Sequence, residues 1–390
     1  AARPRSRAAS RCPASAGESL PGVRFVGTAD DTVPYLLLAL VAAAGVSFIL
    51  TPLIRRIAVR YDAVDRPDHR RVNKLPVPRG GGVAVAIAFI GVTLALLGLN
   101  AVAPFVAVPP SVQVSDLVGL LVGGALATAF GVIDDALDLR ARWQFVGQLG
   151  LAAFAIALGF VVDFVANPFG PGVIRLGGAI SIGFTVLWIS GMINSINFID
   201  GLDGLSSGIG LIAAVTLGVI SLTTQVGQPF IAVLCFALAG SLIGFLRWNF
   251  HPAAIFAGTS GVMFLGYTLA LLSILGTAKV AVAMLVLGVP IIDAFWIIVR
   301  RLAERRSPFS PDRGHLHHRL LDVGLSHRQT VLLIYGLCVL LAVLALFLTG
   351  ATQLYAFAAV FVASGFALFA LDRGGFGPAA PRAPKAELRD

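Results

Sequence analysis

Residues 194–205 read Asn-Ser-Ile-Asn-Phe-Ile-Asp-Gly-Leu-Asp-Gly-Leu and lie between two long apolar runs. Polar side chains recur at every third position of this segment, at Asn194, Asn197, Asp200 and Asp203. This spacing predicts that the four side chains follow one side of a helical or 3₁₀ turn. Carboxylate and amide oxygens suit a hard cation such as Mg²⁺, which commonly bridges to phosphates. The segment therefore predicts a cation and phosphate site at a membrane boundary. The alternative is a polar loop that only joins two spans.

The composition excludes an ordinary soluble domain. Hydrophobic residues make up 57% of the 390 residues and charged residues only 13%, with a mean hydropathy of +0.89. Long apolar runs favour helices over a barrel, because each helix satisfies its own backbone hydrogen bonds in lipid. The three cysteines show no paired or metal-ligand spacing, so no disulfide framework is expected. The predicted fold is therefore that of an all-α polytopic membrane protein.

Apolar runs recur along the chain and predict about eleven transmembrane helices. They lie near residues 34–54, 80–99, 116–133, 143–162, 179–193, 208–224, 230–246, 261–275, 280–299, 330–348 and 353–371. The run at 261–275 is the weakest and is a candidate re-entrant or tilted piece. We expect a disordered basic arm at 1–31, an integral membrane domain at 32–372 and a disordered cytoplasmic tail at 373–390.

Lysine and arginine residues are distributed unevenly between the two sides of the predicted bundle. One side carries 22 of the 29, and the other carries 7, five of which lie in the N-terminal arm. Because basic loops tend to stay cytoplasmic, the richer side is predicted to face the cytoplasm. The net charge of +9 follows from this distribution, so no nucleic-acid partner is expected. The cytoplasmic side holds the C-terminal tail and the loops at 55–79, 134–142, 194–207, 247–260 and 300–329.

A second polar motif ends another apolar run, where residues 131–139 read Gly-Val-Ile-Asp-Asp-Ala-Leu-Asp-Leu. An acid pair such as Asp134 and Asp135 at a helix end is costly unless it meets a cation or water. Repulsion between neighbouring carboxylates can also raise one pKa and produce a base near neutrality. The pair is therefore a catalytic candidate, and the alternative is a purely structural role.

Three other loops of the same face offer candidate phosphate contacts. Lys74 and Arg79 are candidates to neutralise phosphates, and the three glycines at residues 80–82 admit the close approach of a ligand or a helix. Asn249 follows the seventh apolar run and is a candidate polar contact. Histidines among arginines in the loop at 300–329 favour a diphosphate cradle or a proton-transfer group, with a zinc site as the competing interpretation. The residues that carry this hypothesis are Arg313, His315, His317 and His318.

These motifs, in this order and on one face, resemble the polyprenyl-phosphate N-acetylhexosamine-1-phosphate transferase family. The similarity extends from about residue 36 to residue 371. The segment at 307–318, Ser-Pro-Phe-Ser-Pro-Asp-Arg-Gly-His-Leu-His-His, is similar to the branch that transfers GlcNAc-1-phosphate rather than to the branch that takes UDP-MurNAc-pentapeptide. The resemblance implies that an undecaprenyl-type lipid phosphate attacks the β-phosphorus of a UDP-sugar and releases UMP. It also implies Mg²⁺, with Mn²⁺ as an alternative, and a site at the bacterial plasma membrane.

The resemblance implies a role for each matching residue. Asp134 and Asp135 would be the pair that orients or deprotonates the lipid phosphate, and Asp200 would be a third catalytic acid at the nucleotide site. The metal ligands would be Asn197, Asp203 and the residue at position 259. The substrate contacts would be Lys74, Asn194, Asn249, Arg313, His315, His317 and His318.

One position departs from the pattern of the family. The family normally has Gly-Asp-x-Gly-Ser after the seventh span, and the Asp is a principal Mg²⁺ ligand, but residues 258–262 read Gly-Thr-Ser-Gly-Val. The neutral hydroxyl of Thr259 binds Mg²⁺ more weakly than a carboxylate does. Either another acid, such as Asp293, completes the site, or the chain is a divergent or impaired member.

We expect an active transferase whose partners are a UDP-sugar, a polyprenyl phosphate and the membrane, with a homodimer left open. The first alternative is a non-catalytic paralogue that binds lipid phosphate or nucleotide, motivated by Thr259. The second is a membrane transporter, which would place polar groups at mid-membrane along a pathway. Here the polar motifs gather on one face, and no internal repeat is evident.

Overall fold

The computed structural model describes residues 29–66, 76–170, 172–223, 226–275, 279–307 and 314–373. Lys74 and Arg313, most of the predicted N-terminal arm and most of the predicted tail lie outside these ranges, so the predictions about them stay predictions. In the described ranges the chain is mainly helical and has only two short strand pairs, which confirms the predicted all-α class.

The described ranges contain thirteen helices and two short antiparallel strand pairs. The antiparallel strand pairs are β1 (Val64–Asp65) with β2 (Val77–Pro78), and β3 (Phe164–Ala166) with β4 (Val173–Arg175). The helices are α1 (Ala29–Arg60), α2 (Gly82–Val102), α3 (Val114–Leu137), α4 (Ala141–Ala157), α5 (Gly178–Ile199), α6 (Leu205–Ser221), α7 (Pro229–Asn249), α8 (Gly258–Ile274), α9 (Lys279–Val286), α10 (Gly288–Ala303), α11 (Leu316–Asp322), α12 (His327–Phe347) and α13 (Ala351–Arg373).

Six of the described helices are long and apolar enough to cross a membrane, namely α1, α2, α3, α5, α7 and α12. The pair α9 and α10 is bent by 77° and makes a seventh if it counts as one span. Each predicted apolar run coincides with a helix or with this bent pair, but the count of eleven spans is not confirmed. The break also lies in the run at 280–299 rather than at 261–275, where a re-entrant piece was expected.

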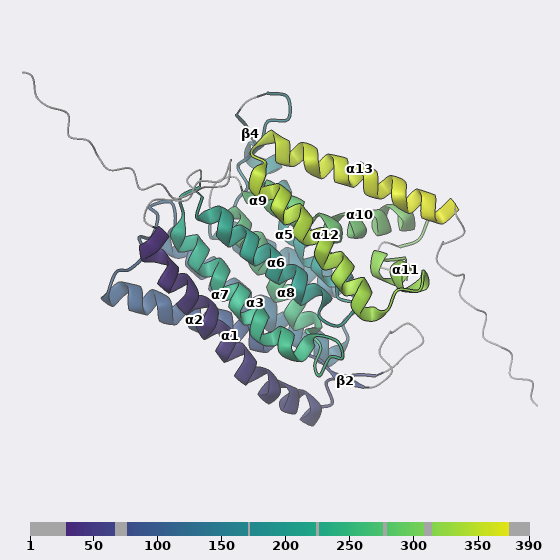
Figure 1. Ribbon diagram of the computed structural model, residues 1–390, viewed down its shortest axis with the longest axis horizontal. Helices are drawn as coiled ribbons and strands as arrows, with labels where there is room; N and C mark the ends of the chain where they lie inside the picture. Colours follow the sequence, from purple (N-terminus) through teal and green to yellow (C-terminus); the bar gives the residue numbers. More distant parts are fainter. Residues whose placement is uncertain are drawn as a thin grey trace, which may run out of the picture.

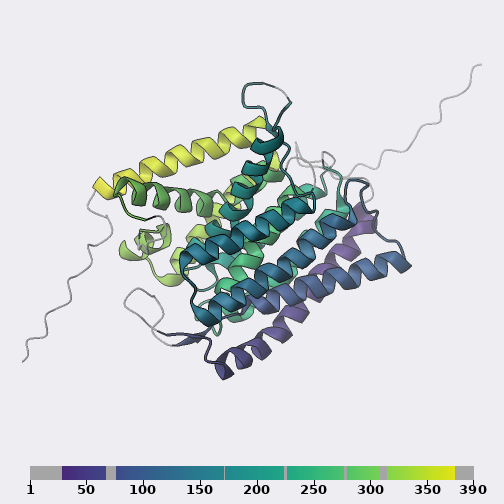
Figure 2. The same cartoon turned by 180° about the vertical axis from the view of Figure 1, so that it is seen from behind.

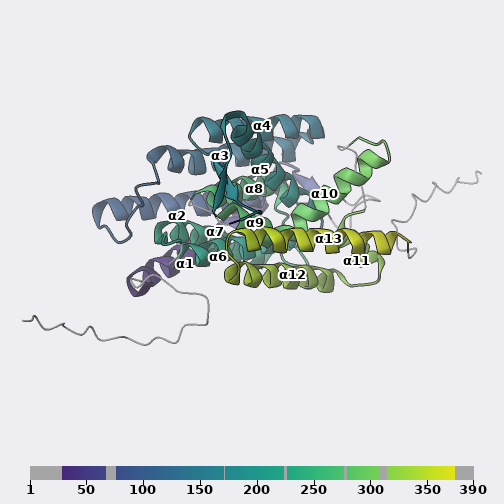
Figure 3. The same cartoon turned by 90° about the horizontal axis from the view of Figure 1, so that it is seen from above.

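The short helix α8 lies at the centre of the bundle, between α3 and α5 on one side and α6 on the other (Figure 3). Its 17 residues span about 26 Å at 1.5 Å per residue, less than the roughly 30 Å of a hydrocarbon core. Nearly all of its side chains are buried. A helix surrounded by protein does not need the full span length, which explains why hydropathy alone miscounts the spans.

The outermost helix α1 packs along α7 and turns its other face outward. Val41 and Ile49 on α1 are 66% and 69% exposed, as expected for side chains that face lipid. On α7, Gly240 and Gly244 face the α1 backbone, where a Cβ atom would collide with the carbonyls of Leu40 and Ala44. This is the small-residue spacing that lets two membrane helices approach closely.

Successive helices run in alternating directions, so the connections gather at two ends. We call one the polar end: it holds β1 and β2, the C-terminus of α3, the α5–α6 and α7–α8 connections, α11 and the start of α12. We call the opposite end the hairpin end, after the β3–β4 pair. It also holds the start of α3 and the α12–α13 connection. In Figure 1, α11 and β2 lie at the lower right and β4 at the top, and Figure 2 shows the same arrangement from behind.

Candidate functional site

A cavity of about 340 Å³ opens at the polar end. It is bounded by segments that are far apart in the sequence, and four of its residues are aspartates. Its lining residues are Asp65, Arg79, Asp135, Asn197, Asp200, Gly201, Leu202, Asp203, Asn249, Phe256, Ala257, Gly258, Thr259, His318 and His327. The predicted convergence of acids and bases from distant motifs therefore occurs at one place.

Asp135 faces the N-terminus of α8. Its Oδ1 accepts a hydrogen bond from the Thr259 backbone N–H at 2.8 Å, and its Oδ2 accepts from the Ser260 N–H at 3.1 Å and the Ser260 hydroxyl at 2.9 Å. These are orphan donors of a helix start, so Asp135 caps α8 from another helix. Gly258 has φ +72° and sits directly against this carboxylate. The cap holds the Thr259 side of α8 at the cavity wall.

Asp200 caps the C-terminal end of α5 and is held by the hydroxyl of Ser206, which donates to its Oδ1. The pKa of the Asp200 carboxyl is raised to about 7, mainly by burial and also by the neighbouring charges of Asp135 and Asp203, while the Ser206 hydrogen bond opposes the shift. A carboxyl group that titrates near neutrality beside other acids suits either proton transfer or cation binding.

The asparagines predicted for the site divide into two groups. Asn197 lines the cavity, and its side chain makes no hydrogen bond to another residue in the described ranges. Asn249 also lines the cavity, but its amide accepts from Ser207 at 2.9 Å and donates to the Ile255 carbonyl at 3.0 Å. Asn194 points away to α4, where its Nδ2 donates to Gln148 at 2.6 Å.

The predicted acid pair is also divided. Asp134 is 4% exposed and does not line the cavity. Its two carboxylate oxygens accept from Gln144 Nε2 at the start of α4, at 2.9 and 3.0 Å. Of the two acids, only Asp135 faces the space where a substrate could bind.

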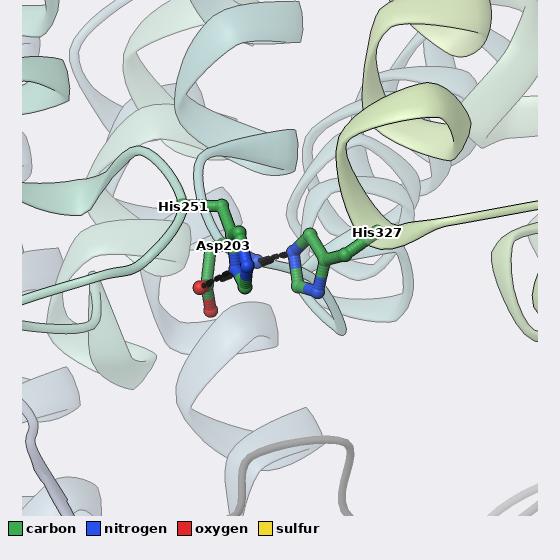
Figure 4. A group of neighbouring side chains, drawn as sticks. All are labelled: Asp203, His251 and His327. Atoms are coloured by element: carbon green, nitrogen blue, oxygen red, sulfur yellow. Dashed lines mark hydrogen bonds and ion pairs between the residues drawn. The ribbon is translucent and has the colours of Figure 1, made fainter.

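Asp203 belongs to a cluster with His251 and His327, shown in Figure 4. Its Oδ2 lies 2.7 Å from His251 Nδ1 and accepts the Ala253 N–H at 3.1 Å, and its backbone N–H donates to His327 Nε2 at 3.0 Å. Their potential ligand atoms lie within 4.8 Å of one another. However, the two imidazole rings are stacked, 4.2 Å apart and only 22° from parallel. Their lone pairs lie in nearly parallel planes and do not meet at one ion, so this arrangement is a hydrogen-bonded cluster.

Arg79 and Asp65 form an ion pair that lines the cavity. Arg79 Nε donates to Asp65 Oδ1 at 2.7 Å across the β1–β2 pair. The Phe256 N–H donates to the Pro78 carbonyl, and the Gly81 N–H donates to the Phe256 carbonyl. These hydrogen bonds attach the β1–β2 pair to the α7–α8 connection. The glycines at 80–82 therefore serve the close approach of a helix, which was one of the two predicted alternatives.

The histidine motif reaches the cavity through α11. His318 lines the cavity, whereas His317 is 1% exposed and packs against Gly201, the residue after Asp200. Neither ring nitrogen of His317 has a hydrogen-bond partner among the described residues. Burial lowers the pKa of His317 well below its ordinary value, and the neighbouring histidines add to the shift. His315 does not line the cavity and instead pairs with Asp293.

Three residues of the site escaped the sequence-based prediction. His327 and His251 each begin or follow an apolar run as a single histidine, without a motif around them. Asp65 belongs to a loop in which several acids and bases are equivalent by pattern. A signal was present for His327. Ser326 and Gln329 form a capping box, which places His327 in the first turn of an apolar helix and therefore at a membrane boundary.

The cavity offers oxygen donors of the kind that a hard divalent cation prefers, although among the described residues no three of its acids bring their ligand atoms within 4.8 Å of one another. Asp135, Asp200, the free Oδ1 of Asp203 and the unengaged amide of Asn197 all offer oxygen donors. Burial and the neighbouring acids raise the pKa of Asp200, so a cation nearby would favour its charged form. Arg79, His318 and His327 line the same cavity and offer donors to phosphate oxygens.

Comparison with known proteins gives a consistent result. The sequence model of a family described as glycosyl transferase family 4 matches residues 117–277. The chain is 36% identical over 329 residues to a probable undecaprenyl-phosphate N-acetylglucosaminyl 1-phosphate transferase of Bacillus subtilis, a match that covers 83% of this chain and 87% of the relative. It is 37% identical over 329 residues to the decaprenyl-phosphate N-acetylglucosaminephosphotransferase of Mycobacterium leprae, with 78% and 81% covered. It is 30% identical over 302 residues to the undecaprenyl-phosphate alpha-N-acetylglucosaminyl 1-phosphate transferase of Yersinia pestis, with 74% and 78% covered.

Proposed function

The chain belongs to glycosyl transferase family 4, and we propose that it transfers N-acetylglucosamine 1-phosphate from UDP-N-acetylglucosamine to a polyprenyl phosphate. An oxygen of the lipid phosphate forms a bond to the β-phosphorus of the nucleotide sugar. The bond between the β-phosphorus and the oxygen that bridges it to the α-phosphorus breaks, and UMP leaves with that oxygen. The product is a lipid diphosphate sugar that begins a cell-envelope glycan. The observation that carries the proposal is the joint presence of acids and bases around one cavity in a chain with these relatives.

Arg79 and His318 bind the phosphates in this proposal. Phosphoryl transfer requires that negative charge be neutralised and that the reacting groups be aligned. Arg79 is already oriented by Asp65, and His318 is presented by α11, so both are fixed before a substrate binds. Such preorganised donors contribute more than mobile ones, because little reorganisation remains at the moment of reaction.

Asp135 and Asp200 handle the proton of the lipid phosphate. Asp200 has one carboxylate oxygen held by Ser206, which leaves the other free to accept a proton. Its pKa of about 7 matches a group that exchanges a proton near neutral pH. Asp135, fixed by three donors from α8, orients the attacking group. Asp134 supports this geometry only through its contact with Gln144.

Asn197, Asp203 and Asp135 are the residues that would hold Mg²⁺, with Mn²⁺ as an alternative. The ion would neutralise the diphosphate and make UMP a better leaving group. Thr259 stands at the wall with its backbone N–H committed to Asp135, and its hydroxyl offers at most a weak ligand. The carboxylates already at the cavity compensate for the acid that this position lacks.

The polar end faces the cytoplasm in this proposal, and the protein resides in a bacterial plasma membrane. The support is the positive-inside distribution, in which 22 of the 29 basic residues lie in the loops and tail that the sequence predicts to be cytoplasmic. UDP-sugars are cytoplasmic, so this orientation also gives the cavity access to its donor. A transporter is not favoured, because its polar groups would follow a pathway through the bundle.

UMP release by the purified protein tests the proposal. The assay contains polyprenyl phosphate, Mg²⁺ and one of a panel of UDP-sugars, with each component omitted in turn. We expect release that requires all three components and is fastest with UDP-N-acetylglucosamine. Release that ignores the lipid phosphate, or no release under saturating conditions, would contradict the proposal.

A further inference from the structure

Helix α10 carries a carboxylate into the packed interior. Asp293 is 5% exposed, on a helix whose outer side chains Phe295 and Leu302 are 45% and 57% exposed. An acid in such a membrane helix is costly unless it is paired. Both carboxylate oxygens of Asp293 are engaged: Oδ2 lies 2.8 Å from His315 Nδ1, and Oδ1 accepts the Leu316 backbone N–H at 2.9 Å.

These two contacts determine where α11 begins. His315 is the residue that precedes α11, yet its own side chain makes no capping hydrogen bond to the helix. Asp293 supplies the missing acceptor from α10, because it binds the first N–H of α11 directly. The His315 ring is also held from α5, where Phe198 packs 5.6 Å away at 55°. His315 is therefore fixed between two helices of the bundle.

Helix α11 carries this position to the cavity within one turn. The rings of His315 and His317 are nearly parallel, at 11°, with centroids 5.6 Å apart. His317 in turn packs against Gly201, and its ring lies 4.3 Å from that of His318, which lines the cavity. A displacement of His315 would therefore move the two rings beside the turn that carries Asp200.

We propose that Asp293 is a positioning residue that acts through His315 and α11 to place His317 and His318 at the cavity. This inference rests on the proposed function. Asp293 touches neither the cavity nor its lining acids, so it does not complete a metal site, which was one expectation from the sequence. Asp293 instead links α10 to α11, the helix that carries His317 and His318 to the cavity.

A double-mutant cycle tests whether Asp293 acts through His315. The variants are Asp293→Ala, His315→Ala and the double variant, each assayed for kcat and KM of UMP release. Misplacement of a catalytic group by about 1 Å can cost about 100-fold, so we expect each single change to lower kcat by about 10- to 100-fold. KM for the UDP-sugar should change little. The double variant should be no worse than the poorer single variant, because both changes remove one contact.

The control is a matched pair at the hairpin end, where Asp163 Oδ1 accepts the Ser181 hydroxyl at 3.0 Å. Asp163→Ala and Ser181→Ala should leave kcat within about twofold of the unmodified protein, a range typical of non-functional sites. Multiplicative losses in the Asp293 and His315 cycle would overturn the inference. So would a loss confined to protein yield, with an unchanged kcat for each folded molecule.

Asp293→Asn separates positioning from charge. The asparagine oxygen still accepts the Leu316 N–H, and its amide can donate to the other tautomer of His315, so most of kcat should return. A variant as poor as Asp293→Ala would show that the charge itself is needed and would contradict positioning. Hydrogen–deuterium exchange of residues 316–322 tests the same contact without catalysis. Asp293→Ala should increase exchange there and Asp293→Asn should not, even if the proposed function failed.

Discussion

The two ends of the bundle each carry a cavity, and the two cavities differ in chemistry more than in size. The hairpin-end cavity, about 660 Å³, is nearly twice as large as the polar-end cavity of about 340 Å³. Its lining is mainly apolar, and its two acids, Asp116 and Asp163, are engaged by nearby groups of the same end. The smaller cavity gathers four aspartates together with Arg79 and two histidines. Convergence of opposed charges from distant segments, rather than volume, therefore identifies the site.

The largest expected effect compares one aspartate from each end. Asp200→Asn removes the carboxyl group that titrates near neutrality, and we expect UMP release to fall by more than about 100-fold, as for other essential acid–base groups. Asp116→Asn weakens the capping box at the start of α3 and should leave the rate within about twofold. Equal losses at the two ends would remove the functional distinction between the cavities.

The next largest effect compares Gly201, at the polar end, with Gly191, inside α5. A Cβ atom at Gly201 would occupy the position of the His317 ring, so Gly201→Ala should displace α11 and lower kcat by about 10- to 100-fold. Gly191→Ala on α5 is the matched control, because open space surrounds that position. Its rate should match that of the unmodified protein. A Gly201→Ala enzyme with full kcat would show that His317 does not need its present place.

Position 259 sharpens the account of the metal site. Because three carboxylates already face the cavity, Thr259→Asp should lower the Mg²⁺ concentration for half-maximal rate by about 3- to 10-fold, equivalent to about one kcal/mol of binding. The kcat at saturating Mg²⁺ should change less than tenfold. Titration of UMP release with Mg²⁺ measures both quantities. A gain from near zero to full activity would instead favour the non-catalytic alternative.

The smallest expected effect is a pH dependence of stability. The pKa of Asp200 is about 7 in the folded protein and 3.8 when unperturbed, so the folded state holds a proton that the unfolded state releases. Stability should therefore fall as the pH rises through the window from about 4 to 7, and should level off above it. The lowered pKa of His317 acts in the opposite direction over part of this window. Without Mg²⁺, the thermal midpoint of the unmodified protein should therefore drop relative to that of Asp200→Asn, by about 3 °C or more between pH 5 and pH 8.

Asp200→Asn checks the origin of that pH dependence. The variant carries no titrating group at this position, so its midpoint should drop less as the pH rises than that of the unmodified protein. Asp163→Asn, with its acid at the hairpin end, should keep the original pH dependence. A drop of equal size in all three proteins would assign the effect to other groups.

Much of the fold was predictable because hydrophobicity is a local property. Each apolar run of the sequence coincides with a helix or a bent pair, and the motifs identified the family that the relatives confirm. The number of spans was not predictable in the same way. The length of α8 reflects its burial among other helices, and the bend near Leu287 lies within an unbroken apolar run. Both depend on tertiary packing, which hydropathy does not contain.

The site was predictable in its composition but not in its orientation. The spacing of the 194–205 segment placed Asn197, Asp200 and Asp203 at the cavity, but α5 ends at Ile199 and Asn194 turns to Gln148. Neighbouring acids on α3 also face different partners, because adjacent positions of a helix point in directions about 100° apart. His251 and His327 approach each other only through the fold, from positions 76 residues apart in the chain.

The most direct test of the account is a cryo-EM structure of the protein in a lipid nanodisc with UDP-N-acetylglucosamine and Mg²⁺. We predict density for the diphosphate in the polar-end cavity, in contact with Arg79 and His318 and close to Asp135 and Asp200. Nucleotide density in the hairpin-end cavity, or at the polar end but away from these four residues, would contradict it.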